Sequence, residues 1–176
     1  KHFSPWSVRL DPDDLIAWHN KEWNGPITAV SVMHAMFTLC ARHQGSKTYI
    51  CKDNNLFDFC CPIAKELPLS RFIYLHRDPR DVIASQLNRP LKSRSAVKLA
   101  TLWRDEQIKT IQAVDSLAAS GNPVAKVSYE ALVSDESAVI AGICECLKLD
   151  LSSEKRSTAF TDEKSDIHEW KNLDKP

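Results

Sequence analysis

The sequence predicts an α/β fold in which a parallel sheet is flanked by helices. Three short runs with strand character, at residues 48–51, 71–76 and 124–128, alternate with longer segments whose apolar residues recur at helical spacing. Such alternation is typical of parallel sheets, because neighbouring parallel strands need a crossover long enough to hold a helix. The chain has 176 residues, of which 43% are hydrophobic, so we expect one domain over residues 1–176.

The first 47 residues are predicted to form a helical N-terminal region. Apolar positions at helical spacing indicate helices over residues 11–23 and 27–42. Gly25 and Pro26 separate the two, because this pair interrupts helical backbone.

The first predicted strand, residues 48–51, is followed at once by Lys52. Open α/β sheets bind ligands at the carboxyl ends of their strands, which makes Lys52 a candidate binding residue. An ordinary polar turn, favoured by Asp53 and Asn54, explains the same residues. A helix over 56–66 would complete a βαβ unit with the strand at 71–76.

A change from strand to helix is predicted directly after residues 71–76. Asp78 suits the N-cap of a helix over 79–89, and Pro79 suits its first position. Asp81 stands three residues after Asp78, which is the spacing of a capping box.

The same stretch holds a candidate anion site. Arg77 ends the strand, amides are expected to be free at the helix start, and Ser85 and Arg89 share one side of the helix. Together they would form a cradle for an anion. A capped surface helix with ordinary salt bridges is the alternative, and the residue pattern leaves both open.

The second half of the chain is predicted to continue the alternation. A long helix over 93–120 ends at Gly121, the third strand spans 124–128, and another amphipathic helix spans 134–147. Tyr129 follows the third strand directly and suits a half-buried tyrosine that caps a strand.

Charge and cysteine content argue against several classes of function. The formal net charge is zero, so we expect no nucleic acid and no anionic membrane as partner. The six cysteines include no CxxC pair, and no histidine cluster has zinc-ligand spacing, so we expect no metal. We expect mostly buried, reduced thiols and a cytoplasmic protein, with an oxidising compartment as the alternative. The sequence shows no signal peptide and no long apolar span.

The stretch around Arg77-Asp78-Pro79 and Ser85 resembles the 3′-phosphate-binding element of sulfotransferases that use 3′-phosphoadenosine-5′-phosphosulfate (PAPS). In that family an Arg at the strand end and a Ser eight residues later hold the 3′-phosphate. The resemblance therefore implies that Arg77 and Ser85 bind the cofactor, with Arg89 as an outer ligand. It also implies a P-loop NTPase-like sulfotransferase fold, present here in part.

Further elements extend the resemblance over residues 48–176. Lys52-Asp53 is similar to the Lys-Asp element of tyrosylprotein sulfotransferases and related bacterial enzymes, which makes Lys52 the candidate for stabilising charge on the leaving sulfuryl group. Tyr129-Glu130 resembles a Tyr-Glu-x-Leu element whose Tyr contacts the nucleotide. Late Arg-Ser-Thr and Lys-Pro elements imply a catalytic Ser157 and a cofactor-binding Lys175.

Two family features are missing from the sequence. Asn54 stands where cytosolic sulfotransferases have their catalytic His, so the resemblance names no general base. No Gly-rich loop for the 5′-phosphosulfate is present either. We therefore expect a fragment of a longer chain that is inactive alone.

The implied function is transfer of a sulfuryl group from PAPS to a hydroxyl or amine of a carbohydrate, a peptide or a small alcohol. Two alternatives remain open. A small-molecule kinase-like phosphoryl transferase would need a Walker-type loop and Mg²⁺-binding residues. A non-catalytic nucleotide- or partner-binding domain would need only part of the site.

Overall fold

The computed structural model describes residues 10–88 and 95–149. Its sheet consists of two parallel strands, β1 (Phe72–His76) and β2 (Val124–Ser128), in a register that sets Phe72 opposite Val124 and His76 opposite Ser128. The crossover between them contains α4 (Pro79–Leu87) and α5 (Ala96–Ala119). An α/β fold with parallel strands at 71–76 and 124–128 is therefore confirmed.

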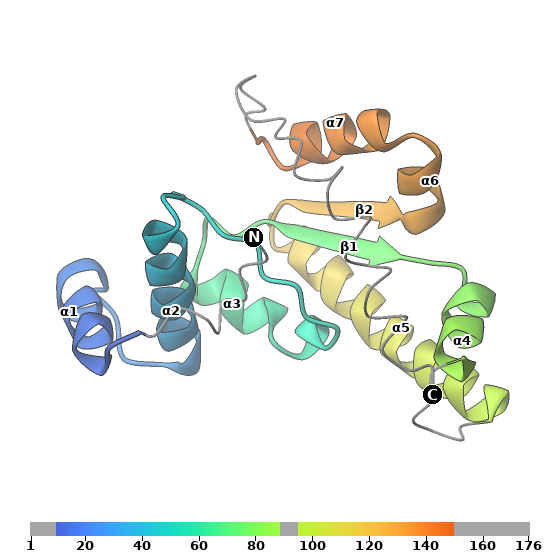
Figure 1. The fold of residues 1–176 in the computed structure, drawn as a ribbon, viewed down its shortest axis with the longest axis horizontal. Coiled ribbons are helices and arrows are strands. Elements are labelled where there is room, and N and C mark those ends of the chain that lie inside the picture. Colours follow the sequence, from blue (N-terminus) through green and yellow to red (C-terminus); the bar gives the residue numbers. More distant parts are fainter. Residues whose placement is uncertain (1–9, 89–94, 150–176) are drawn as a thin grey trace, which may run out of the picture.

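Helices cover both faces of β2 (Figure 1). On one face, Phe72 of β1 packs with Leu117 of α5 and with α3 (Cys60–Glu66). On the other face, Ala125 and Val127 pack against α7 (Glu136–Cys146) and the residues just after it. Alternate residues of a strand point to opposite faces, so the short β2 anchors two separate apolar clusters.

The N-terminal region forms two helices, α1 (Pro12–Glu22) and α2 (Ala29–His43), close to the predicted spans. They pack against each other beside the sheet, and α2 also contacts α3 (Figure 1). An exposed ion pair between Arg42 of α2 and Glu22 of α1 links them at 2.6 Å.

Residues 48–51 do not form the predicted strand. They have no regular secondary structure and belong to no sheet in the described part of the chain, and Ile50 is 90% exposed. Tyr49 explains the difference, because its ring stacks on Phe37 of α2 and its hydroxyl lies 2.7 Å from Nδ1 of His34. The segment is thus fixed by side-chain packing on a helix rather than by a strand ladder, and the predicted βαβ unit is not formed.

Two other predicted elements differ in detail. The helix predicted over 56–66 is divided into the short 3₁₀ turn η2 (Leu56–Asp58) and α3. The residues after β2 turn at once into α6 (Tyr129–Ser134), a helix that the sequence did not predict. Ser128 explains the early turn, because its hydroxyl accepts a hydrogen bond from the amide of Ala131 and so caps α6. The long helix α5 ends at Ala119, two residues before the predicted stop at Gly121, whose φ of +79° is the left-handed conformation that glycine favours.

Candidate functional site

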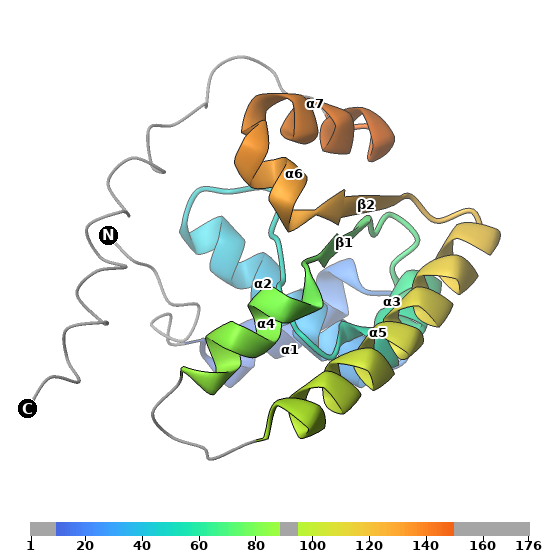
Figure 2. The same cartoon turned by 90° about the vertical axis from the view of Figure 1, so that its right-hand side faces the viewer.

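The site lies where both strands end. Figure 2 looks toward the carboxyl ends of β1 and β2, from which α4 and α6 begin. Since His76 is opposite Ser128 in the parallel register, the residues that follow them, Arg77 and Tyr129, start side by side. This is the edge at which open α/β sheets place their ligands.

The start of α4 has the predicted cap. Asp78 is the N-cap and Pro79 the first helical residue, and the Asp78 carboxylate accepts the amide N–H of Arg80 at 2.8 Å. The same carboxylate binds the Arg80 guanidinium through two nitrogens, at 3.0 and 2.6 Å. Hydrogen bonds from the Arg80 side chain and then from its amide lower the pKa of Asp78 to about 2. The expectation of free amides is therefore wrong for Arg80, whose N–H is already capped by Asp78.

Arg77 keeps donors for a ligand. Its guanidinium lies over the ring of Tyr129, 4.5 Å from the ring centroid, and one terminal nitrogen is 3.3 Å from the Asp81 carboxylate. The Nε atom is buried and has no hydrogen-bond partner among the described residues. A buried donor of this kind is usually satisfied in a working protein. Arg77 is thus oriented by Tyr129 and still able to bind an anion.

Ser85 lies on the same side of α4 as the Arg77 guanidinium. The contact with Asp81 shows that the Arg77 side chain runs along the first turn of the helix. Ser85 is four residues beyond Asp81, hence one turn further on the same face, and it is exposed. Arg89, predicted as the outer ligand, lies outside the described residues.

The charge around Arg77 is not simply positive. Arg80 is paired with Asp78 through two of its three nitrogens, and the carboxylates of Asp81 and Glu130 lie close to the strand end. The Asp81 carboxylate contacts one terminal nitrogen of Arg77 at 3.3 Å. This contact is longer than the 2.6 Å between a terminal nitrogen of Arg80 and the Asp78 carboxylate. An anion that approached this terminal nitrogen of Arg77 would compete with Asp81.

Glu130 is a site residue that the sequence did not predict. Its Oε1 accepts the backbone N–H of Asp78 at 2.8 Å, although the two residues are 52 positions apart. Its Oε2 accepts the hydroxyl of Ser128 at 2.6 Å. The sequence carries a signal for Glu130 in the Tyr129-Glu130 pair directly after a strand. The resemblance assigns a role only to the Tyr of this pair.

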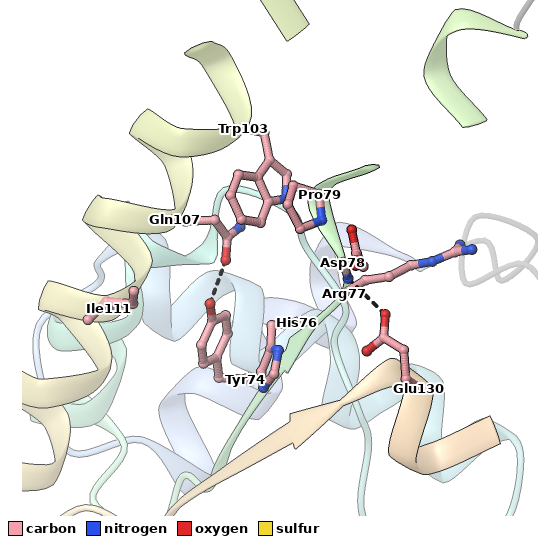
Figure 3. A pocket seen from close by; sticks show the side chains of 9 residues that line it. All are labelled: Tyr74, His76, Arg77, Asp78, Pro79, Trp103, Gln107, Ile111 and Glu130. Carbon is pink, nitrogen blue, oxygen red and sulfur yellow. Dashed lines mark hydrogen bonds between the residues drawn. The ribbon is translucent and has the colours of Figure 1, made fainter. Parts of the chain in front are cut away.

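A pocket of about 460 Å³ opens beside the strand end, on the α5 side of β1 (Figure 3). Tyr74 and His76 line it from the strand, and Trp103 and Gln107 line it from α5. The Tyr74 hydroxyl donates to Oε1 of Gln107 at 2.5 Å. Arg77, Asp78 and Glu130 line it at the strand end, and Figure 3 shows the Arg77 side chain extending away from the rings of Tyr74 and Trp103.

The remaining predicted site residues are not part of this cluster as described. Lys52 is exposed in the irregular segment after residue 51, where its Nζ donates to Oδ1 of Asn54 at 2.7 Å. It does not follow a strand end, so the reason given for its placement at the sheet edge is wrong. Ser157 and Lys175 lie outside the described residues.

Within 10–88 and 95–149, no group of three or more His, Cys, Asp or Glu side chains is arranged to hold a metal ion. No helix in that part of the chain is long and apolar enough to span a bilayer.

Three of the six cysteines are buried, so the expectation of mostly buried thiols is wrong: Cys51, Cys61 and Cys146 are free and at least partly accessible.

Comparison with known proteins identifies the family. No curated protein and no solved structure matches the chain. A family model described as the sulfotransferase family matches residues 7–153, which include Lys52, Arg77, Ser85 and Tyr129. The match covers most of the sequence and agrees with the α/β fold and with the resemblance of the Arg77–Ser85 stretch. The chain belongs to the sulfotransferase family.

Proposed function

We propose that the protein acts in the transfer of a sulfuryl group from PAPS to an acceptor hydroxyl or amine. The observation that carries the proposal is Arg77, whose guanidinium stacks on Tyr129 at the ends of two parallel strands while its side chain stays 39% exposed. Phosphate oxygens are acceptors that a guanidinium binds through two donors at once. The family membership of the chain supports the choice of PAPS as sulfuryl donor.

The residues around Arg77 fit the 3′-phosphate of this donor. The guanidinium supplies donors, and the exposed hydroxyl of Ser85 lies one helical turn beyond Asp81. The phosphate would replace the Asp81 carboxylate, which now occupies the same donors through a contact of 3.3 Å. Tyr129 would hold the guanidinium plane in place during this exchange.

Other side chains are assigned by resemblance. Lys52 is proposed to stabilise negative charge that develops as the sulfuryl group leaves, and Ser157 to assist it. Arg89 and Lys175 are proposed as further cofactor contacts. When bound, PAPS supplies the sulfuryl group. The acceptor is proposed to be a carbohydrate, a peptide or a small alcohol.

Calorimetry with two nucleotides tests the proposal. Adenosine 3′,5′-bisphosphate and adenosine 5′-phosphate differ only in the 3′-phosphate, so the ratio of their dissociation constants isolates the contribution of that group. A charge-assisted contact contributes about 1.5–3 kcal/mol, so we expect the bisphosphate to bind about 10- to 150-fold more tightly. Equal affinity for both nucleotides would rule out Arg77 and Ser85 as a 3′-phosphate site.

A further inference from the structure

The backbone that connects β1 to α4, at Arg77 and Asp78, is held by a carboxylate from another part of the chain. In a capping box, the side chain at the third helical position accepts the backbone N–H of the N-cap. At the start of α4 that position is Asp81, but its carboxylate is turned to Arg77. The N–H of Asp78 instead donates to Oε1 of Glu130 from the first turn of α6 (Figure 3).

Glu130 is itself fixed on both sides. Its second carboxylate oxygen accepts the hydroxyl of Ser128, which is the N-cap of α6. The hydrogen bond from the Asp78 amide, followed by that from Ser128, lowers the pKa of Glu130 below its usual range. The two hydrogen bonds therefore fix the Glu130 carboxylate in place, and it is ionised at neutral pH.

The two first residues of α6 hold Arg77 in complementary ways. The Tyr129 ring lies under the guanidinium at 4.5 Å, and Glu130 holds the amide of Asp78, the residue directly after Arg77. One contact thus orients the side chain and the other fixes the backbone from which that side chain projects. Without the second contact, the N–H of Asp78 would lose its acceptor, and the backbone between β1 and α4 would be less constrained.

We propose that Glu130 is a positioning residue for the Arg77 anion site, acting through the backbone amide of Asp78. This inference rests on the proposed function, since the anion in question is the 3′-phosphate of the nucleotide. It assigns to α6 a direct part in selecting nucleotides that carry that phosphate.

The role of Glu130 depends on its acceptor oxygen and not on its charge. A carboxylate near a bound phosphate is repelled by it, so the negative charge of Glu130 opposes nucleotide binding. Glutamine keeps a carbonyl oxygen at the same place and removes the charge. Glu130→Gln should therefore preserve the loop, whereas Glu130→Ala removes the acceptor altogether.

The experiment measures the preference for adenosine 3′,5′-bisphosphate over adenosine 5′-phosphate by calorimetry in the whole chain and three variants. Loss of one hydrogen bond predicts that Glu130→Ala lowers this preference about 2- to 10-fold. Glu130→Gln should retain or exceed the wild-type preference. Glu136→Ala is the matched control, because it removes an exposed carboxylate from the first turn of the neighbouring helix α7 and should change nothing.

A second readout follows the Asp78 amide itself. Its hydrogen exchange, measured by NMR, should accelerate in Glu130→Ala and stay slow in Glu130→Gln. If Glu130→Ala does not fold, Glu130→Gln still decides the matter, since a loss of both nucleotide preference and amide protection in it would overturn the role. A Glu130→Ala chain with wild-type preference would overturn it as well. Absence of any 3′-phosphate preference in the wild-type chain would instead overturn the proposed function, and the inference with it.

Discussion

Substitution of Arg77 by alanine should remove the preference for a 3′-phosphate. The guanidinium is held by its contacts with Tyr129 and Asp81, so part of the cost of aligning its donors is already met before the nucleotide binds. Such preorganisation favours a strong contact. Alanine leaves no donor at that place.

The magnitude follows from two opposing terms. A charge-assisted hydrogen bond contributes about 1.5–3 kcal/mol, which corresponds to a loss of about 10- to 150-fold in affinity. The phosphate would compete with Asp81, and the Arg77 side chain is 39% exposed, so solvent screens part of the attraction. We therefore expect the lower end, a loss of about 10- to 30-fold for the bisphosphate.

The assay is calorimetric titration of wild type and Arg77→Ala with both nucleotides at two ionic strengths. Only the bisphosphate should lose affinity, and its advantage over the monophosphate in wild type should shrink as salt rises. Arg80→Ala serves as the control, because it removes the same charge three residues away from a side chain that is 89% exposed and bound to Asp78. Equal weakening of both nucleotides in Arg77→Ala, or the same loss of preference in Arg80→Ala, would rule out Arg77 as the ligand of the 3′-phosphate.

Three further outcomes are expected. Lys52→Ala should lower kcat about 10²- to 10³-fold, with little change in nucleotide affinity, in any preparation with measurable sulfuryl transfer; an unchanged kcat would remove Lys52 from the mechanism. Phe72→Ala should destabilise the fold by about 3–5 kcal/mol in urea unfolding, because Phe72 is 8% exposed, whereas Ile73→Ala, at a site 47% exposed, should cost far less. Burial, followed by the charge of Arg42, lowers the pKa of His34, so the unfolded chain takes up a proton more readily than the folded one as pH falls through about 6.5. Between pH 7.5 and 5.5 the free energy of unfolding should therefore fall less in His34→Gln than in wild type. Identical shifts of the urea midpoint in the two proteins would contradict this.

Local chemistry was enough to predict the start of α4. Asp78 and Pro79 each favour one position at a helix N-terminus, and the structure places both there. The strands β1 and β2 were also predictable, since each anchors a buried apolar cluster next to a clear helix start.

Where contacts between distant segments decide the structure, the sequence patterns were misleading. Residues 48–51 have the composition of a strand, but Tyr49 packs on His34 and Phe37 of α2 and the segment joins no sheet among the described residues. The spacing of Asp81 from Asp78 likewise indicated a capping box. That bond is made by Glu130 instead, and the side chain of an aspartate is one methylene group shorter than the Glu or Gln of a capping box.

The register of the two strands is what assembles the site. Pairing of His76 with Ser128 sets Arg77 beside Tyr129 and Asp78 beside Glu130, so two consecutive contacts arise from one alignment. A slip of one residue would turn Ala125 and Val127 away from α7 and would separate both pairs at once. The burial of these small side chains against α7 therefore fixes the geometry of Arg77 as well as the fold. Substitutions that loosen the α7 cluster should weaken 3′-phosphate recognition even though none of them touches the nucleotide.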